Sequence, residues 1–194
     1  MKAIILRHLE ESLEVKRQFI ENHIDHIIRA AEKMAACLNG GNKILIFGNG
    51  GSAADAQHLA AEFVNRFKIE RPPLAALALT TDTSILTSIG NDYHFDDIFS
   101  KQIEALGRKD DIAWGLSTSG NSKNVIRAIK TANKKGLFSI ASTGRGGALA
   151  DCARMVFAAQ SDDTAQIQEA HISLGHILCD LVERMLFPEK YKNG

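Results

Sequence analysis

The sequence predicts an α/β protein whose mostly parallel sheet is covered by helices on both faces. Short apolar runs of strand length recur along the chain, at 44–47, 74–79, 112–116, 137–142 and 155–158. Several of them end in turns rich in glycine or hydroxyl residues, and segments with a helical pattern lie between them. Strands that alternate with helices in this way form βα repeats, in which neighbouring strands run parallel.

Length and composition favour one domain in the cytoplasm. A chain of 194 residues suffices for one sizeable core and is short for two. Its 23 basic and 23 acidic residues form no basic cluster, so we expect no direct nucleic-acid binding. We find no signal peptide pattern and no apolar run long enough to span a membrane. The widely spaced Cys37, Cys152 and Cys179 are typical of reduced, buried thiols.

The first element is helical. From Ile4 to Leu38 the chain has no proline or glycine and repeats apolar residues at helical spacing. Helices of this length are unusual, so we predict a break near Asn22-His23 and hence two helices. Further apolar positions, such as Val15, widen the stripe beyond what one sheet face needs. This width predicts that the helices also pack against another copy of the chain.

The next stretch, Lys43 to Glu62, combines a strand, a glycine turn and a helix. The apolar run stops at Gly48-Asn49-Gly50-Gly51, and Ser52 stands where a helix N-cap would. The free N–H groups of the first helical turn suit an anion, most simply a phosphate. On the same helix His58 and Glu62 are four residues apart and share one face. Such a pair can bind a metal or move protons, although it is more often only hydrogen-bonded.

The middle of the chain contains a second turn of this kind. After the second strand we predict a cap at Thr80-Thr81-Asp82, a helix at 84–89, a polar loop at 91–94 and a helix at 96–106. The third strand then runs into Ser117-Thr118-Ser119-Gly120-Asn121-Ser122, followed by a helix at 123–135. Its hydroxyls could simply cap that helix. Two such turns after strands of one sheet favour a phosphate site, because ligands gather at the carboxyl ends of parallel strands.

The last helix is predicted from Asp163-Thr164 to Leu186, where Pro188 follows. It carries Gln168, His171 and His176. At about 100° per residue, His176 lies two turns beyond Gln168 and roughly 80° around the helix axis. Periodicity therefore does not choose between the two histidines.

With these residues assembled, the chain resembles the sugar isomerase (SIS) domain family and, within it, the phosphoheptose isomerases. The resemblance rests on the motifs GNGGSAADAQHLAAE, GNDY and STSGNS, and on Gln168-Glu169 followed by His176. It implies a single SIS domain over 1–194, with an N-terminal helical region at 1–38 and an α/β core at 43–194. It further implies a three-layer α/β/α sandwich with a five-stranded parallel sheet. The expected assembly is a homotetramer with the N-terminal helices at the oligomer interface and the sites between subunits.

The resemblance also implies a reaction. The expected activity is an aldose–ketose isomerisation of sedoheptulose 7-phosphate to D-glycero-D-manno-heptose 7-phosphate, the first step of nucleotide-activated heptose synthesis for surface glycans. Glu62 is expected to act as the base and His176 as the acid. One zinc ion per subunit is expected to bind to His58, Glu62, Gln168 and His176. The residues expected to bind the sugar phosphate are Asn49, Gly50, Gly51, Ser52, Arg66, Asn91, Asp92, Ser117, Thr118, Ser119, Ser122 and Gln168.

Two alternatives belong to other functional classes. The segment 65–72 and the ending Leu186-Phe187-Pro188 are similar to a non-enzymatic relative that binds the bacterial replication initiator, so the chain could be a protein-binding scaffold. A pure scaffold has no need for the joint presence of the acid–base and metal residues, which favours the enzyme. A regulatory sugar-phosphate sensor is disfavoured because we find no DNA-binding segment. His94 and Gln166 depart from the family pattern and bear on fine specificity alone.

Overall fold

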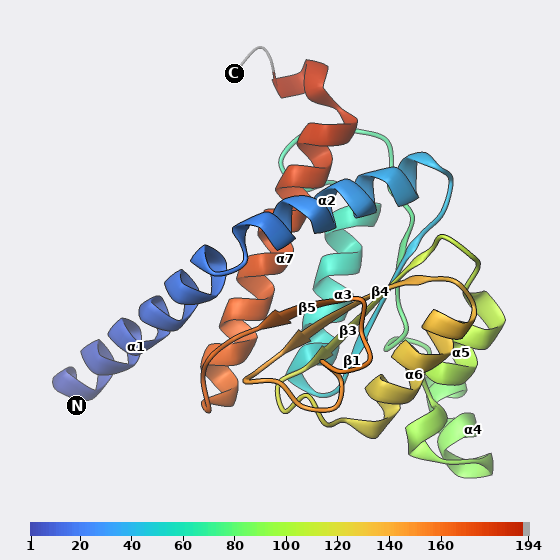
Figure 1. Ribbon diagram of the computed structural model, residues 1–194, viewed down its shortest axis with the longest axis horizontal. Coiled ribbons are helices and arrows are strands. Elements are labelled where there is room, and N and C mark those ends of the chain that lie inside the picture. Colours follow the sequence, from blue (N-terminus) through green and yellow to red (C-terminus); the bar gives the residue numbers. More distant parts are fainter. Residues whose placement is uncertain (192–194) are drawn as a thin grey trace.

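The fold is described here from a computed structural model, which places residues 1–191. The last three residues of the predicted domain, 192–194, lie outside the described residues. In Figure 1 a central sheet is flanked by helices on both faces. The strands are β1 (Ile44–Gly48), β2 (Ala76–Ala78), β3 (Ile112–Ser117), β4 (Phe138–Thr143) and β5 (Met155–Ala158). They form one five-stranded sheet in the order β2-β1-β3-β4-β5, and each neighbouring pair is parallel.

The helices follow the order of the sequence. They are α1 (Lys2–Glu21), α2 (Ile24–Asn39), α3 (Gly51–Val64), α4 (Thr83–Asp92), α5 (Ser100–Leu106), α6 (Lys123–Lys134) and α7 (Thr164–Leu186), with short 3₁₀ turns η1 (Phe95–Asp97) and η2 (Pro188–Tyr191). The predicted break at Asn22-His23 is confirmed, because α1 ends and α2 begins on either side of it. The cap at Asp163 is confirmed as well, since its carboxylate accepts the N–H groups of Ala165 and Gln166.

Alternation along the strands produces two cores. Ile44 and Ile46 of β1 belong to the core beneath α2, α3 and α7, whereas Leu45 and Phe47 belong to the core beneath α5 and α6. All of these side chains are fully buried. Because successive strand residues point to opposite faces, an uninterrupted apolar run is what a sheet covered on both sides requires. The predicted three-layer sandwich is therefore confirmed.

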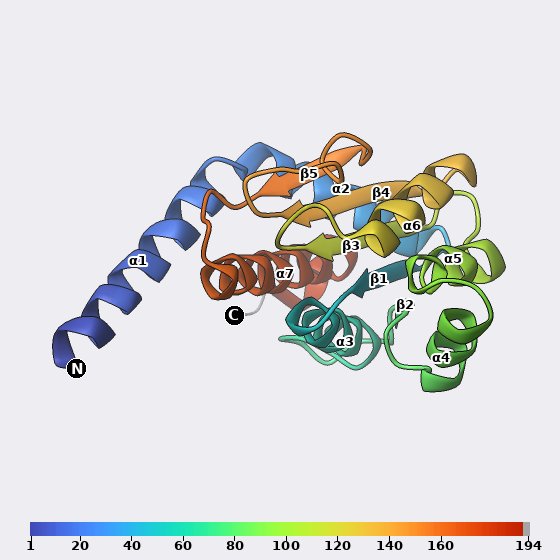
Figure 2. The same cartoon turned by 90° about the horizontal axis from the view of Figure 1, so that it is seen from below.

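Helix α1 differs from the other helices in its surroundings. It extends away from the sandwich in Figures 1 and 2, although part of it contacts α7. The large apolar side chains exposed along it are Ile4, Ile5, Leu6, Leu9 and Leu13. Such a row is unusual on a surface that only water covers.

Several local predictions were wrong. The helix after β1 starts at Gly51 with Gly50 as its N-cap, so Ser52 lies buried within the first turn and caps nothing. Helix α4 runs through Asp92, so Asn91 and Asp92 end a helix and do not begin a loop. The predicted helix 96–106 is divided into η1 and α5, and β2 is shorter than its apolar run. Helix boundaries depend on where turns close, and propensity locates them poorly.

The predicted burial of the thiols is confirmed for Cys37 and Cys179, whereas Cys152 is only partly buried. Cys37, Cys152 and Cys179 are all free, and burial raises the pKa of Cys37 to about 12. Within the part of the chain that the structure describes, no helix is both long and apolar enough to cross a bilayer.

Candidate functional site

Two loop corners lie next to each other at the carboxyl ends of β1 and β3. These strands are neighbours in the sheet, and Gly48 at the end of β1 pairs with Leu116 of β3. The corner after β1 (residues 48–52) and the corner after β3 (residues 117–122) therefore share one edge of the sheet, where open α/β sheets bind ligands. We call these two corners together the anion cradle.

Glycine is required in the first corner for close packing and for the turn. A Cβ atom on Gly48 would lie 2.8 Å from the Leu116 carbonyl oxygen, and one on Gly51 would lie 2.4 Å from Gln168 Nε2. Gly50 has a φ of 56°, in the left-handed region that side chains disfavour. The free N–H groups at the start of α3 are thus held at the sheet edge by backbone packing.

An asparagine pair joins the two corners. Asn49 Nδ2 donates to Asn124 Oδ1 at 2.9 Å, and Asn124 Nδ2 donates back to Asn49 Oδ1 at 2.8 Å. Asn124 is almost fully buried, and its Oδ1 also accepts the N–H of Val125. Asn49, predicted as a substrate ligand, therefore also holds the cradle together. Asn124 was missed because one polar residue in the first turn of a helix carries no signal in the sequence.

The second corner is closed by its own hydroxyls and by the loop after β4. Ser117 Oγ donates to Ser122 Oγ at 3.0 Å. Gly120 has a φ of 65°, and a Cβ atom there would lie 1.7 Å from the carbonyl oxygen of Gly146. The hydroxyl groups of the predicted phosphate site do converge, and the backbone behind them leaves no room for a side chain.

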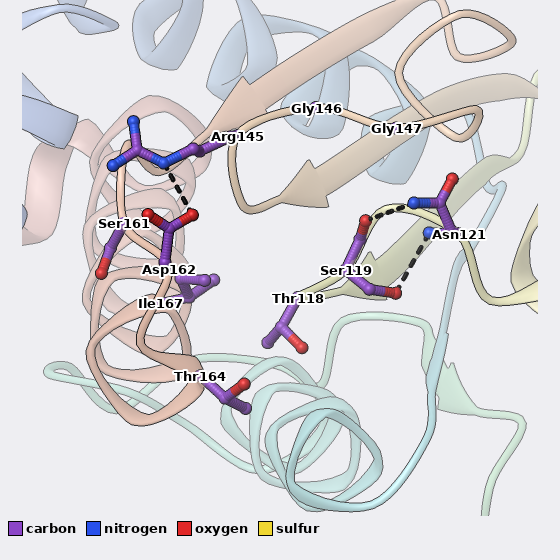
Figure 3. Close-up of a pocket in the computed structure, with 10 residues that line it drawn as sticks. All are labelled: Thr118, Ser119, Asn121, Arg145, Gly146, Gly147, Ser161, Asp162, Thr164 and Ile167. Carbon is purple, nitrogen blue, oxygen red and sulfur yellow. Dashed lines mark hydrogen bonds and ion pairs between the residues drawn. The ribbon is translucent and has the colours of Figure 1, made fainter.

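A cavity of about 440 Å³ opens beside the second corner (Figure 3). On one side Arg145 Nε donates to Asp162 Oδ1 at 2.8 Å, and both side chains are exposed. The residues that line the cavity are Thr118, Ser119, Asn121, Arg145, Gly146, Gly147, Ser161, Asp162, Thr164 and Ile167. Arg145, Asp162 and Thr164 were not predicted, because only the fold brings the loops after β4 and β5 beside the second corner.

Three side chains from α3 and α7 meet away from the cradle. His58 Nε2 lies 2.9 Å from His176 Nε2 and 3.5 Å from Glu62 Oε1. We call His58, Glu62 and His176 the reactive group. Burial lowers the pKa of His176, the neighbouring His58 lowers it further, and the Glu62 carboxylate opposes this shift. The N–H of one imidazole donates to the ring nitrogen of the other. The reactive group thus contains one carboxylate and two imidazoles that can transfer protons.

The donor types of the reactive group suit zinc, whereas their present arrangement does not enclose an ion. Imidazole nitrogen and carboxylate oxygen are common zinc ligands, and the separations of 2.9 and 3.5 Å resemble the ~3.3 Å edge of a tetrahedron with zinc–nitrogen bonds of about 2 Å. Across residues 1–191, however, no three His, Cys, Asp or Glu side chains are arranged to hold a metal. The Gln168 amide, expected as a further ligand, lies against the Cα of Gly51.

The structure shows which of the two histidines of α7 lies near His58, a choice that helical periodicity did not make. His171 is fully buried, and its Nε2 lies 2.9 Å from the Thr143 carbonyl oxygen. Burial lowers the pKa of His171 to about 4, and its Nδ1 has no hydrogen-bond partner among the described residues. His176 instead faces α3 and is partly exposed. His171 is therefore a core residue, and His176 is the histidine of α7 that joins the reactive group.

In the described part of the chain, three predicted substrate ligands, Asn91, Asp92 and Arg66, are bonded to neither group. Asn91 Nδ2 donates to Asp92 Oδ1 at 2.8 Å at the exposed end of α4. Arg66, just after α3, is exposed and lies 3.8 Å from Glu70. Within residues 1–191 none of these three makes a side-chain hydrogen bond or ion pair with the cradle or the reactive group. A single copy of the chain does not bring them to the site.

Helices α3 and α7 connect the cradle to the reactive group. They lie side by side and run in the same direction (Figures 1 and 2), with Gly51 against Gln168 at one end and His58 against His176 further along. His58 lies seven positions after Gly51, which is about 10 Å along a helix. We call this contact the α3–α7 seam. An anion cradle at one end and proton-transfer groups about two turns away could hold an extended phosphorylated molecule and transform its far end.

The comparisons with known proteins agree with this arrangement. The family model described as SIS domain matches residues 7–144. The chain is 57% identical to a phosphoheptose isomerase of Thermodesulfovibrio yellowstonii over 184 residues, which cover 94% of this chain and 92% of that protein.

Two solved structures are also similar. The structure of phosphoheptose isomerase GmhA from Neisseria gonorrhoeae matches with a TM-score of 0.88 and 47% identity, covering 94% of this chain and 98% of that one. A phosphoheptose isomerase from Francisella tularensis matches with a TM-score of 0.90 and 39% identity, covering 94% of this chain and 97% of that one.

Proposed function

The chain belongs to the SIS domain family and groups there with the phosphoheptose isomerases, and we propose that it converts sedoheptulose 7-phosphate into D-glycero-D-manno-heptose 7-phosphate. The α3–α7 seam carries this proposal, because it places an anion cradle and proton-transfer groups on one pair of helices. The scaffold alternative is not favoured, since the relatives that match nearly the whole chain are isomerases by name.

The side chains are sufficient for the chemistry. Isomerisation moves one proton from C1 to C2 of the sugar and another from the C1 oxygen to the C2 oxygen, through an enediol. We assign the carbon proton to the Glu62 carboxylate and the transfer between the oxygens to His176. In the metal-free chain His58 Nε2 lies 2.9 Å from His176 Nε2, and the hydrogen bond between them holds the His176 tautomer.

The predicted phosphate site is the anion cradle. The helix N-termini of α3 and α6 and the hydroxyls of Ser117, Ser119 and Ser122 would bind the phosphate. The cavity beside the second corner would leave room next to the phosphate end of the ligand. Gln168, which lies against Gly51, would contact the ligand between the two ends of the seam.

Zinc is part of the proposal. His58, Glu62 and His176, joined by Gln168 after a side-chain movement, would hold one ion per subunit through nitrogen and oxygen ligands. When bound, zinc would supply a Lewis acid that polarises the sugar carbonyl. Metal content measured after dialysis should approach one zinc per chain in the wild type and fall in His58→Ala. Equal zinc content in both proteins would contradict this ligand set.

A homotetramer with sites between subunits is also proposed. The exposed apolar row of α1 supports it, as do Asn91, Asp92 and Arg66, which one copy alone leaves outside the site. Light scattering on the purified protein should give four times the chain mass. The double variant Leu9→Glu/Leu13→Glu should shift it toward monomer. A monomeric wild type at micromolar concentration would contradict the proposal.

Turnover is the direct test of the function. Purified protein with zinc should convert sedoheptulose 7-phosphate to the aldose phosphate, followed by NMR of the product. Absence of conversion in a folded, zinc-loaded oligomer would contradict the proposal. We place the enzyme in the cytoplasm, where sugar phosphates are metabolised.

A further inference from the structure

The aromatic ring of Phe67 covers one face of the His176 imidazole. The two ring centroids are 5.6 Å apart, and the ring planes differ by 19°, so the rings are stacked. Phe67 lies in the irregular segment between α3 and β2 and is partly buried. It belongs to the segment 65–72 that resembles the non-enzymatic relative, and the proposed chemistry does not use it.

The backbone at Phe67 is held by a buried carboxylate of α7. The N–H of Phe67 donates to Glu183 Oε1 at 2.9 Å, and the N–H of Lys68 donates to Glu183 Oε2 at 3.0 Å. A second connection lies alongside, where Lys68 Nζ donates to Asp180 Oδ2 at 2.8 Å. These bonds attach the irregular segment to α7, the helix that carries His176.

The same carboxylate forms a buried ion pair that reaches the other side of the reactive group. Arg71 Nε donates to Glu183 Oε1 at 2.8 Å, and both side chains are only 1% exposed. Arg71 Nη2 donates to the carbonyl oxygen of Glu62 at 2.8 Å, and its Nη1 donates to that of Phe63 at 2.7 Å. A guanidinium at these carbonyls stabilises the C-terminal end of α3, where Glu62 lies.

This arrangement bears on the orientation of His176. Rotation of an imidazole about χ2 is broad and roughly two-fold when nothing restricts it. The stacked ring of Phe67 limits that rotation and favours the orientation in which His176 Nε2 lies 2.9 Å from His58 Nε2. A buried ion pair alone is weak support for function, since its net contribution to stability is small. Here, however, the pair contacts both the Glu62 backbone and the segment stacked on His176.

We propose that Phe67, anchored by the buried Arg71–Glu183 pair, is a positioning residue that holds the His176 imidazole in its reactive orientation. The inference rests on the proposed function. It predicts that removal of the ring lowers kcat and leaves the substrate KM nearly unchanged, because the anion cradle lies at the other end of the α3–α7 seam.

The test compares three single variants of the full chain. Phe67→Leu removes the ring and keeps an apolar side chain, and Phe67→Tyr keeps the ring. Phe138→Leu is the matched control, because Phe138 is also partly buried but lies at the start of β4, which β1 and β3 separate from β2, the strand that follows Phe67. Each variant is assayed for kcat and KM at the same zinc content, and its His176 ring protons are followed by NMR at pH 9.

The expected outcome is a loss of about tenfold in kcat for Phe67→Leu, with KM within twofold, and wild-type kinetics for Phe67→Tyr and Phe138→Leu. The His176 ring protons should move downfield in Phe67→Leu alone, because stacking shields them. The proposal is overturned if Phe67→Leu keeps kcat within twofold, or if Phe67→Tyr loses as much as Phe67→Leu. If the wild type itself has no turnover, the proposed function fails, and the ring-proton shift alone decides whether Phe67 orients His176.

Discussion

The two ends of the α3–α7 seam are built from different parts of the chain. The anion cradle consists of turns in which a Cβ atom at Gly48 or Gly120 would overlap backbone atoms, and one at Gly51 would overlap the Gln168 side chain. The reactive group consists of three side chains on two helices, and the His58 side chain is 48% exposed. The backbone fixes the geometry of the anion cradle, whereas the geometry of the reactive group depends on side-chain rotamers. We therefore expect changes in the cradle to alter binding or stability, and changes in the reactive group to alter the chemical step.

The largest effect is expected from Glu62→Gln in the reactive group. Glutamine keeps the size of the side chain but cannot accept the carbon proton, so kcat should fall by about 10²- to 10⁴-fold. The melting temperature should stay close to that of the wild type, since the Glu62 side chain makes no buried ion pair. Glu104→Gln, an exposed position on α5, is the control. If the kcat of Glu62→Gln stays within tenfold of the wild type, Glu62 is not the general base. The expected difference between changes in the cradle and changes in the reactive group would then be contradicted.

The next effect concerns the stability of the core around His171 and depends on pH. His171 has a pKa lowered from 6.5 to about 4 by burial, so the unfolded chain takes up a proton at a higher pH than the folded one. The contribution of neutral His171 to the free energy of unfolding is fully present above pH 6.5. It is lost as the pH falls toward 4, which lowers that free energy by about 3 kcal/mol.

Urea unfolding between pH 7.5 and 4 would measure this loss. In His171→Gln the amide can still donate to the Thr143 carbonyl, but the group no longer titrates, so the slope of unfolding free energy against pH should be smaller. An unchanged slope would mean that other groups account for the acid sensitivity.

A smaller effect is expected from Gly51→Ala at the cradle. The new methyl group would lie 2.4 Å from Gln168 Nε2, the mobile end of a side chain, so Gln168 moves and the fold survives. We expect kcat/KM to fall about tenfold, mainly through KM, with little change in melting temperature.

A double-mutant cycle sharpens that test. In a Gln168→Ala background the clash is absent, so Gly51→Ala should cost little further. Additive losses in the double variant would show that Gly51 acts through something other than Gln168.

The smallest effect is expected from Arg145→Gln at the cavity. The Arg145–Asp162 pair is exposed, and such pairs contribute between about 0 and 1 kcal/mol, so the melting temperature should barely change. We expect KM to rise a few-fold if the cavity receives part of the sugar, and kcat to stay constant. Arg154→Gln, also exposed, is the control. A loss of kcat greater than tenfold would place Arg145 in the chemical step.

The accuracy of the sequence predictions followed the range of the interactions that produce each feature. Apolar runs and cap residues located every strand of the sheet, the break at Asn22-His23 and the cap at Asp163, because these depend on neighbouring residues. The same reasoning placed the N-cap at Ser52 and missed Asn124, because a turn also depends on what packs against it from β3 and α6. Arg145 and Asp162 could not be predicted, since the loops that carry them meet the second corner only in the folded sheet.

The sequence by itself determined the βα alternation, the two glycine- and hydroxyl-rich corners and the pairing of His58 with Glu62 on one helical face, because these follow from residues within a few positions of one another. Tertiary structure alone decided which histidine of α7 faces α3, because His171 and His176 differ in surroundings and not in spacing. It also decided that Phe67 stacks on His176. That contact depends on Glu183, more than a hundred residues away in the chain, and no local pattern encodes a hydrogen bond across such a distance.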